Sequence, residues 1–269
     1  MMGGKKRKIL VETSAVRSLV GPTTSKHRSL FQDRYRDSRV YSSVYIRMEY
    51  VRRWVCSMIT IALAVSRHRS VPEALVYLEQ DFSIREVKSY LACVAEVLGQ
   101  CGAMNDTRAA AEEIGRCAFH WAERFDRLLG SQIQNRSRCM RGNNQLQITS
   151  FETLMDELAQ FHIRFSTPVF DCDVNDFLKM DDPRSQCHRL LDSLTEKEVS
   201  CLKTLREYVE KKTCVTCTQC ERIGDLVISL EQTKSYTLVH TDNSFSHLCD
   251  ARGMPHEVLP SVRGTEKLN

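Results

Sequence analysis

Four acidic residues stand where a protein chain commonly presents carboxylates to a metal ion. Each of them follows a short apolar run or opens an apolar helical pattern; they are Glu12, Glu49, Asp225 and Asp242. Carboxylate oxygens suit Mg²⁺ and Mn²⁺, which neutralise phosphate charge, lower the pKa of a bound water and stabilise a leaving oxygen. The pattern therefore predicts a magnesium or manganese site. The alternative is that each acid only favours the dipole at the start of a helix.

The elements that would position these acids lie at the two ends of the chain. A buried strand over 8–11 ends at Glu12, and β-rich residues 40–44 pass into a helix that carries Glu49. Towards the C-terminus we expect a helix over about 224–234, a strand over 236–240, a short helix around 244–251 and a final strand near 257–259. Because active sites of open α/β sheets lie at the carboxyl ends of the strands, we expect the four acids to converge there.

The middle of the chain, from about residue 54 to 212, is expected to be almost wholly helical. Capping boxes are read at Ser83 to Glu86, Thr149 to Glu152 and Thr195 to Glu198, and loops at 99–107, 130–144 and 166–183. We predict an α/β fold with a parallel-sheet core from residues 1–55 and 214–269. Residues 56–213 would form a mostly helical insertion or subdomain, part of which completes the core.

Positive charge is concentrated in the N-terminal quarter. Residues 1–69 contain 15 Lys and Arg against 4 Asp and Glu, a net charge of +11, whereas the remaining 200 residues contain 23 against 30, a net of −7. Such a field suits a polyanionic partner such as nucleic acid. The Arg-rich stretch 28–53 is interleaved with tyrosines on which bases could stack. The alternatives are a solvated basic surface, and a strand whose Tyr41 and Tyr45 fill the core, which we favour for these two residues.

Twelve cysteines accompany no secretory signal, since the basic opening at 5–8 leads only into three apolar residues before Glu12. The longest apolar runs, such as 61–65, are too short to span a bilayer. We therefore expect reduced thiols, a cytoplasmic location and no membrane association. Cys214, Cys217 and Cys220 form a CxxCxxC run that could bind zinc or an iron–sulfur cluster with a fourth ligand, and the candidates for it are Cys187, His188, Cys201 and Cys249. Buried free thiols are the interpretation we favour.

Both ends of the chain resemble PIN-domain nucleases, the family that includes the toxin ribonucleases of bacterial toxin–antitoxin pairs. The matching segments are LVETS at 10–14, the helix with Glu49, GDLVIS at 224–229, LVHTDNSF at 238–245 and ARGMPHEVLP at 251–260. The match covers about the first 55 and the last 55 residues. Glu12 stands where the family has an Asp, Thr13 matches the following hydroxyl residue, and His240 replaces the family's Thr or Ser.

The resemblance implies a PIN-like core and a hydrolase, a magnesium- or manganese-dependent endoribonuclease that cleaves RNA by two-metal-type catalysis. It assigns the metal and the catalysis to Glu12, Glu49, Asp225 and Asp242. Two alternatives stay open. One is a catalytically impaired scaffold of the same fold, possibly zinc-stabilised, that binds nucleic acid, a protein partner or a second copy. The other is a zinc-stabilised helical interaction protein.

Overall fold

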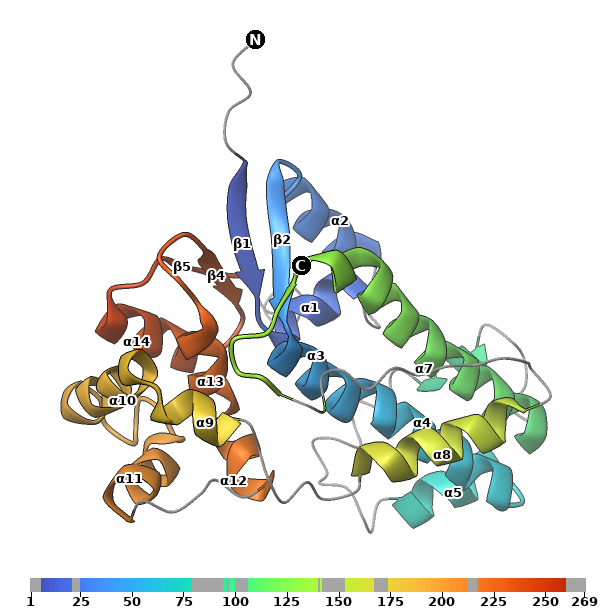
Figure 1. Cartoon of the computed structure of the whole chain (residues 1–269). Helices are drawn as coiled ribbons and strands as arrows, with labels where there is room; N and C mark the ends of the chain where they lie inside the picture. Colours follow the sequence, from blue (N-terminus) through green and yellow to red (C-terminus); the bar gives the residue numbers. More distant parts are fainter. Residues whose placement is uncertain are drawn as a thin grey trace. The chain divides into compact units, whose positions relative to one another are not determined.

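The computed structural model describes residues 6–20, 25–78, 94–95, 97–99, 106–139, 141, 153–166, 174–211 and 217–259. The chain divides into two compact units (Figure 1). The first contains residues 1–49, 129–143 and 168–269, and the second contains 50–128 and 144–167. Residues 168–213, which lie within the expected helical insertion, belong to the unit with the sheet.

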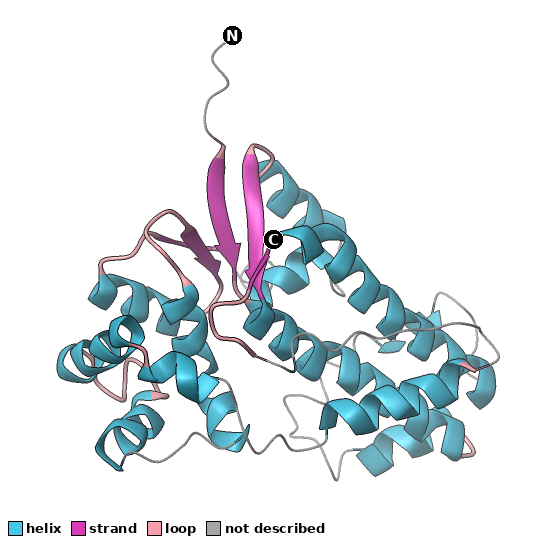
Figure 2. Cartoon of the chain, in the orientation of Figure 1, coloured by secondary structure: helices cyan, strands magenta, loops and turns pink. Residues whose placement is uncertain are grey.

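Five strands form one all-parallel sheet in the first unit (Figure 2), which confirms the α/β fold class. They are β1 (Arg7–Val11), β2 (Ser38–Ser43), β3 (Ile133–Gln134), β4 (Thr237–His240) and β5 (His256–Val258). β3 lies inside the stretch 130–144 that we expected to be a loop, so that expectation was wrong for Ile133 and Gln134. Its residues join the sheet by pairing with the end of β2, where Ser42 lies opposite Ile133.

The strand order is β3-β2-β1-β4-β5, so the chain turns from one side of β1 to the other. β1 pairs with β2 on one side and with β4 on the other, with Val11 opposite Val239. The amide of Glu12 extends the second pairing by donating to the carbonyl of Val239 at 3.0 Å. In open α/β sheets such a reversal of strand order opens a crevice at the carboxyl ends of the two strands.

The central strand is buried on both faces, as expected for a parallel strand covered by helices. Ile9, Leu10 and Val11 are at most 1% exposed. The helices of this unit are α1 (Thr13–Val20), α2 (Ser25–Arg34), α3 (Val44–Tyr50, whose last residue belongs to the second unit), α9 (Val174–Lys179), α10 (Asp181–Ser193), α11 (Leu202–Lys211), α12 (Cys217–Arg222), α13 (Gly224–Glu231) and α14 (Asn243–Arg252). α1 packs against β4, and α14 packs against β5, α10 and α13.

Two expectations for residues 166–201 were wrong. α9 and the start of α10 occupy residues 174–183, the described part of the expected loop that follows the end of α8. Only half of the expected capping box at Thr195 forms: Glu198 accepts hydrogen bonds from the amide and hydroxyl of Thr195 at 2.7 and 2.8 Å, but its own amide donates to the carbonyl of Thr195 rather than to the hydroxyl. It closes a turn rather than opening a helix, because α11 begins only at Leu202. The other two capping boxes lie outside the described residues.

The tyrosines of the basic N-terminal stretch serve packing. Tyr45 is 1% exposed, and the ring of Tyr41 meets that of Tyr236 edge-on, with centroids 4.9 Å apart. Lys8 lies over both of these rings, with its ammonium 5.5 Å from the Tyr236 centroid. The interpretation of Tyr41 and Tyr45 as packing residues therefore agrees with the structure.

The second unit contains only helices within its described residues. They are the π-helical turn η1 (Val51–Val55), α4 (Cys56–Arg67), α5 (Val71–Leu78), α7 (Thr107–Leu129, whose last residue belongs to the first unit) and α8 (Leu154–Ser166). α4 packs against α5 and α8, where the hydroxyl of Thr60 meets Nε2 of His162 at 2.9 Å. α7 approaches α8 at Gly115, where an added Cβ would lie 2.6 Å from Cδ1 of Leu158.

A search of the described helices for a membrane span found none with the length and apolar character that crossing a bilayer requires.

Candidate active site at the carboxyl edge of the sheet

Glu12 directly follows β1 and is almost inaccessible, at 3% exposure. Its Oε2 accepts the amide of Ser14 at 2.5 Å, and its Oε1 accepts the amide of Ala15 at 2.9 Å, both in the first turn of α1. The same Oε1 also accepts the amide and the hydroxyl of Thr241, at 3.1 and 3.2 Å. The side chain thus joins the end of β1, the start of α1 and the residue that follows β4.

Burial raises the pKa of Glu12 from its ordinary 4.5 to about 7. The amides of Ser14 and Ala15 lower this pKa, and the negative charges of Glu49 and Asp225 raise it further. Three of the four predicted acids therefore act on one another electrostatically at the place where the strand order reverses.

Glu49 and Asp225 are presented by the two helices beside this edge. The hydroxyl of Thr13 donates to Oε2 of Glu49 on α3, and Asp225 lies in the first turn of α13, where the helix dipole favours a carboxylate. The two helices meet at Gly224, where an added Cβ would be in ordinary contact with the Tyr45 hydroxyl at 3.4 Å and with Oε1 of Glu49 at 3.9 Å. Tyr45 in turn donates to the carbonyl of Cys220 at 2.7 Å, which ties α3 to α12.

Asp242 has a different role in the structure. It is exposed, and its Oδ1 accepts the amide of Ser244 at 2.8 Å, so it is the N-cap of α14. Asp242 is not among the largest influences on the pKa of Glu12, whereas Glu49 and Asp225 are. The structure thus groups Glu12, Glu49 and Asp225 electrostatically and uses the fourth predicted acid to start a helix.

The types of donor in this group suit a divalent cation, because hard cations prefer carboxylate oxygens and would offset the repulsion among these charges, which adds to burial in raising the pKa of Glu12. The arrangement of the donors is incomplete. Throughout the described part of the chain, no three His, Cys, Asp or Glu side chains gather closely enough to hold a metal ion. The physical reason at Glu12 is that both of its oxygens are directed to amides and to Thr241.

His240, which the resemblance placed at a Thr or Ser position, is fully buried at the end of β4. Its Nε2 meets Nδ1 of His256 at 3.0 Å, and Nε2 of His256 meets Oδ1 of Asp250 at 3.0 Å. Burial and the neighbouring His256 lower the pKa of His240 to about 4, so its ring is neutral at pH 7. His240 therefore packs the sheet edge, with its ring beside that of Phe245.

Sequence reasoning missed two residues that shape the site, Thr241 and Gly224. Thr241 was only the residue between a strand and an acid, yet it supplies two of the four hydrogen bonds to Glu12. Gly224 offered the better signal, because a glycine just before an acid at the head of an apolar helix can mark a close helix contact.

The described cysteines are free thiols. Burial raises the pKa values of Cys187, Cys201 and Cys249 to about 12, so these thiols are protonated at neutral pH. Cys220 is buried with its Sγ 3.5 Å from the Tyr45 hydroxyl. Cys214 and the side chain of Cys217 lie outside the described residues, so the proposed zinc or cluster site falls on that part of the chain.

Compared with protein-family models, curated proteins and solved structures, the chain matches none of them. The fold and the site define an α/β protein with an all-parallel sheet and a group of carboxylates where its strand order reverses.

Proposed function

We propose that the protein is a metal-dependent nuclease that hydrolyses phosphodiester bonds, with RNA as its substrate. The observation that carries this proposal is the grouping of Glu12, Glu49 and Asp225 at the reversal of strand order, where burial and, after it, the charges of Glu49 and Asp225 raise the pKa of Glu12. RNA as the substrate, the PIN-like fold and the endonucleolytic mode rest on the resemblance of the two chain ends to PIN-domain nucleases.

A bound Mg²⁺ or Mn²⁺ would neutralise phosphate charge and lower the pKa of a bound water. Glu49 and Asp225 would hold it, with Glu12 beside them. In this proposal the chain's own groups set the position of these acids. Thr13 orients Glu49 through its hydroxyl, and the amides of Ser14 and Ala15 fix the carboxylate of Glu12.

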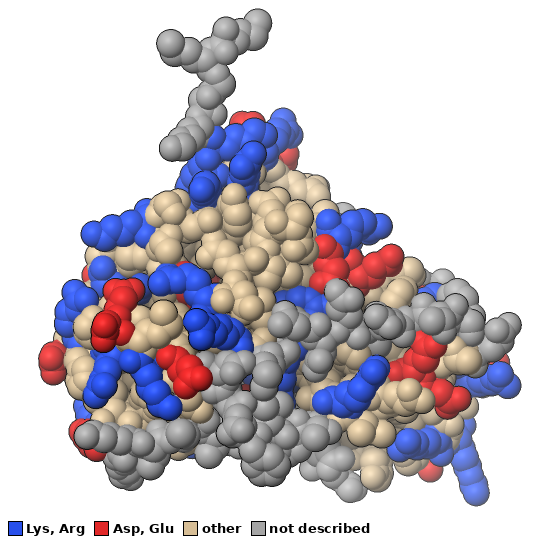
Figure 3. Space-filling model, in the orientation of Figure 1, with Lys and Arg blue, Asp and Glu red and all other residues tan. Residues whose placement is uncertain are grey.

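The basic N-terminal quarter supports a polyanionic substrate by attraction over distance. Lys and Arg side chains gather over the amino-terminal ends of β1 and β2 (Figure 3), where Lys6, Arg7 and Arg39 are exposed. Glu12 follows the other end of β1, which has 5 residues and is therefore roughly 16 Å long at about 3.3 Å per residue. Such a field raises the rate at which an anion arrives rather than contacting the reacting phosphate.

The test is cleavage of a fluorogenic single-stranded RNA by the full chain with Mn²⁺ or Mg²⁺. Asp225→Asn and Glu49→Gln should each reduce the rate at least about 100-fold, the scale on which one catalytic group contributes. Asp33→Asn, which alters an exposed carboxylate on α2, is the matched control. If the folded protein cleaved no RNA with either ion, the proposal would be refuted.

The variant Asp242→Asn tests whether Asp242 also takes part in cleavage. Asparagine caps a helix about as well as aspartate, so the variant should keep its stability. A loss of cleavage at unchanged stability would make Asp242 a ligand as well as a cap, and unchanged cleavage would leave it a cap only.

A catalytically impaired nucleic-acid-binding or interaction scaffold is the second candidate. The four hydrogen bonds that Glu12 accepts within the chain favour it, because they use the carboxylate for structure. This candidate predicts RNA binding in filter or anisotropy assays without cleavage, and binding that Asp225→Asn leaves unchanged.

A further inference from the structure

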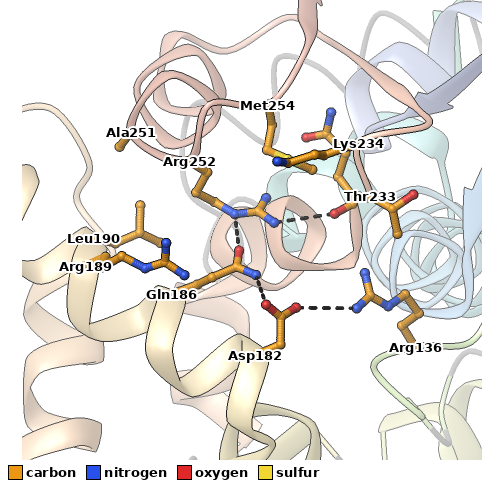
Figure 4. Close-up of a pocket in the computed structure, with 11 residues that line it drawn as sticks. Arg136, Asp182, Gln186, Arg189, Leu190, Thr233, Lys234, Ala251, Arg252 and Met254 are labelled. Carbon is orange, nitrogen blue, oxygen red and sulfur yellow. Dashed lines mark hydrogen bonds and ion pairs between the residues drawn. The ribbon is translucent and has the colours of Figure 1, made fainter.

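A cavity of about 420 Å³ lies in the first unit, and none of the four predicted acids lines it. It is formed by α10, by residues 232–234 before β4, by the end of α14 with Met254, and by Arg136 after β3 (Figure 4). Its volume falls within the usual range for small-ligand sites, about 300 to 1,000 Å³.

The cavity is strongly positive. Four cationic side chains line it from four separate segments, and they are Arg136, Arg189, Lys234 and Arg252. Asp182 is the one acidic residue in the described part of the lining, so four positive charges there face one negative charge, a net of +3. Convergence of charges from separate segments on one hollow suits a compact anion with several negative charges.

Arg252 is held in place by neutral acceptors. Its Nε donates to Oε1 of Gln186, its Nη1 donates to the carbonyl and hydroxyl of Ser229, and its Nη2 donates to the carbonyl of Gln232. Within the described residues no carboxylate forms an ion pair with it. Burial lowers the pKa of Arg252 to about 10, so its charge persists at pH 7 with its desolvation only partly offset.

A chain of contacts continues from Arg252 across the cavity (Figure 4). Nε2 of Gln186 donates to Oδ1 of Asp182 at 2.8 Å, and Nη2 of Arg136 lies 3.9 Å from Oδ2 of Asp182. Arg136 also donates from Nη1 to the carbonyl of Glu231 at 3.1 Å. Two guanidinium groups are therefore positioned before any ligand arrives, which reduces the entropy lost on binding.

Arg189 and Lys234 differ from these two because they are exposed. Arg189 makes a long hydrogen bond from Nε to the carbonyl of Ser185 at 3.4 Å, and in the described part of the chain neither side chain forms an ion pair. Two fixed and two adaptable cations around one hollow are an arrangement that can enclose linked phosphate groups.

We infer that this cavity binds the diphosphate group of a small ligand, either free pyrophosphate or a nucleoside diphosphate. Leu190, Ala251 and Met254 add an apolar wall against which a ribose or a base could pack. The inference is independent of the proposed nuclease site, because the two share no residue.

Isothermal titration calorimetry of the full chain with pyrophosphate, with ADP and with adenosine tests the inference. We expect pyrophosphate or ADP to bind and adenosine not to bind. Arg189→Ala and Lys234→Ala should each weaken binding about tenfold or more, since each removes a charged hydrogen-bond donor. Equal affinities for pyrophosphate and ADP would indicate free diphosphate, and tighter binding of ADP would indicate a nucleotide.

Arg184→Ala is the matched control, because Arg184 is exposed on the same helix and does not line the cavity. Asp225→Asn should bind pyrophosphate as the unmodified chain does, which separates this site from the nuclease site. The inference fails if neither pyrophosphate nor ADP binds, if Arg184→Ala weakens binding as much as Arg189→Ala, or if these variants lose affinity only for an RNA oligonucleotide.

Discussion

Replacing Glu12 by glutamine should remove a pH dependence of stability from the unit that carries the sheet. Glutamine keeps the shape of the side chain, and its carbonyl oxygen can still accept from Thr241 and Ala15, as Oε1 of Glu12 does. It cannot ionise. One hydrogen bond from Ser14 is lost with the second oxygen, which lowers stability by about 1 kcal/mol at every pH.

The magnitude follows from the pKa of Glu12, which burial raises from 4.5 to about 7. Between these two values the folded chain holds a proton that the unfolded chain releases, so stability falls as pH rises through this window and is constant above it. At about 1.36 kcal/mol per pH unit the change is about 3 kcal/mol. Relative to the unmodified chain, Glu12→Gln should therefore gain about 3 kcal/mol between pH 4.5 and pH 7.5.

Hydrogen exchange of the amides in β1 and β4 is the suitable assay, because it reports on opening of this unit alone. Fluorescence would not serve, since both tryptophans, Trp54 and Trp121, belong to the other unit. Glu231, whose pKa burial also raises to about 7, titrates in both proteins and cancels in the difference.

Parallel stability curves for the two proteins would refute this account of Glu12. A second arm tests the metal site without an activity assay. A divalent cation bound beside Glu12 would lower the pKa of Glu12, so Mn²⁺ should flatten the curve of the unmodified chain; Glu12→Gln, which keeps Glu49 and Asp225, should gain stability without a change in the slope of its curve. An unchanged curve for the unmodified chain would count against a cation at this place.

Three further predictions concern single residues. The unmodified chain should lose about 3 kcal/mol of unfolding free energy between pH 6.5 and pH 4, because the unfolded chain takes up a proton that the buried ring of His240, with its pKa of about 4, does not. His240→Gln should abolish this loss. Hydrogen exchange of the β4 amides at these two pH values measures it. Gly253→Ala should lower the stability of the same unit by about 1 kcal/mol, because Gly253 ends α14 at a φ of 61°, which alanine rarely adopts. An added Cβ would meet no atom within 4 Å, so the backbone conformation is the only cost. Exchange of the α14 amides reports the loss. Gly115→Val should destabilise the second unit by about 1 to 3 kcal/mol, because the added group meets Leu158, and urea unfolding followed by Trp121 fluorescence would show it.

The strands that could be predicted form for reasons visible in their own sequence, whereas β3, which was missed, does not. β1 and β4 are apolar runs that end at a polar residue, a pattern legible without knowing their neighbours. β3 is Ile133–Gln134, two residues in a polar stretch, and it is a strand only because Ser42 and Ser43 of β2 lie beside it. Whether such a short segment becomes a strand depends on pairing with a segment far away in the chain, and local sequence carries no information about that pairing.

The site, too, combines features visible in the local sequence with features that only the tertiary structure determines. An acid directly after a strand and before a helix fits a metal ligand and an N-cap equally well, and Asp242 satisfies both descriptions in sequence. The structure shows the cap, since the amide of Ser244 lies 2.8 Å from Asp242. Glu12, Glu49 and Asp225 were brought together by strand order, which depends on how segments far apart in the chain pair.

The extra methylene of Glu12, compared with the aspartate that the resemblance leads one to expect, has a definite consequence. The carboxylate of Glu12 accepts hydrogen bonds from the amides of Ser14 and Ala15 and from the amide and hydroxyl of Thr241. It therefore links the end of β1 to the end of β4. A carboxylate with a pKa of about 7 is only half ionised at neutral pH, so a cation must displace its proton as well as compete with its hydrogen bonds. Metal affinity at this edge should therefore rise steeply between pH 6 and pH 8, and any cleavage should rise with it.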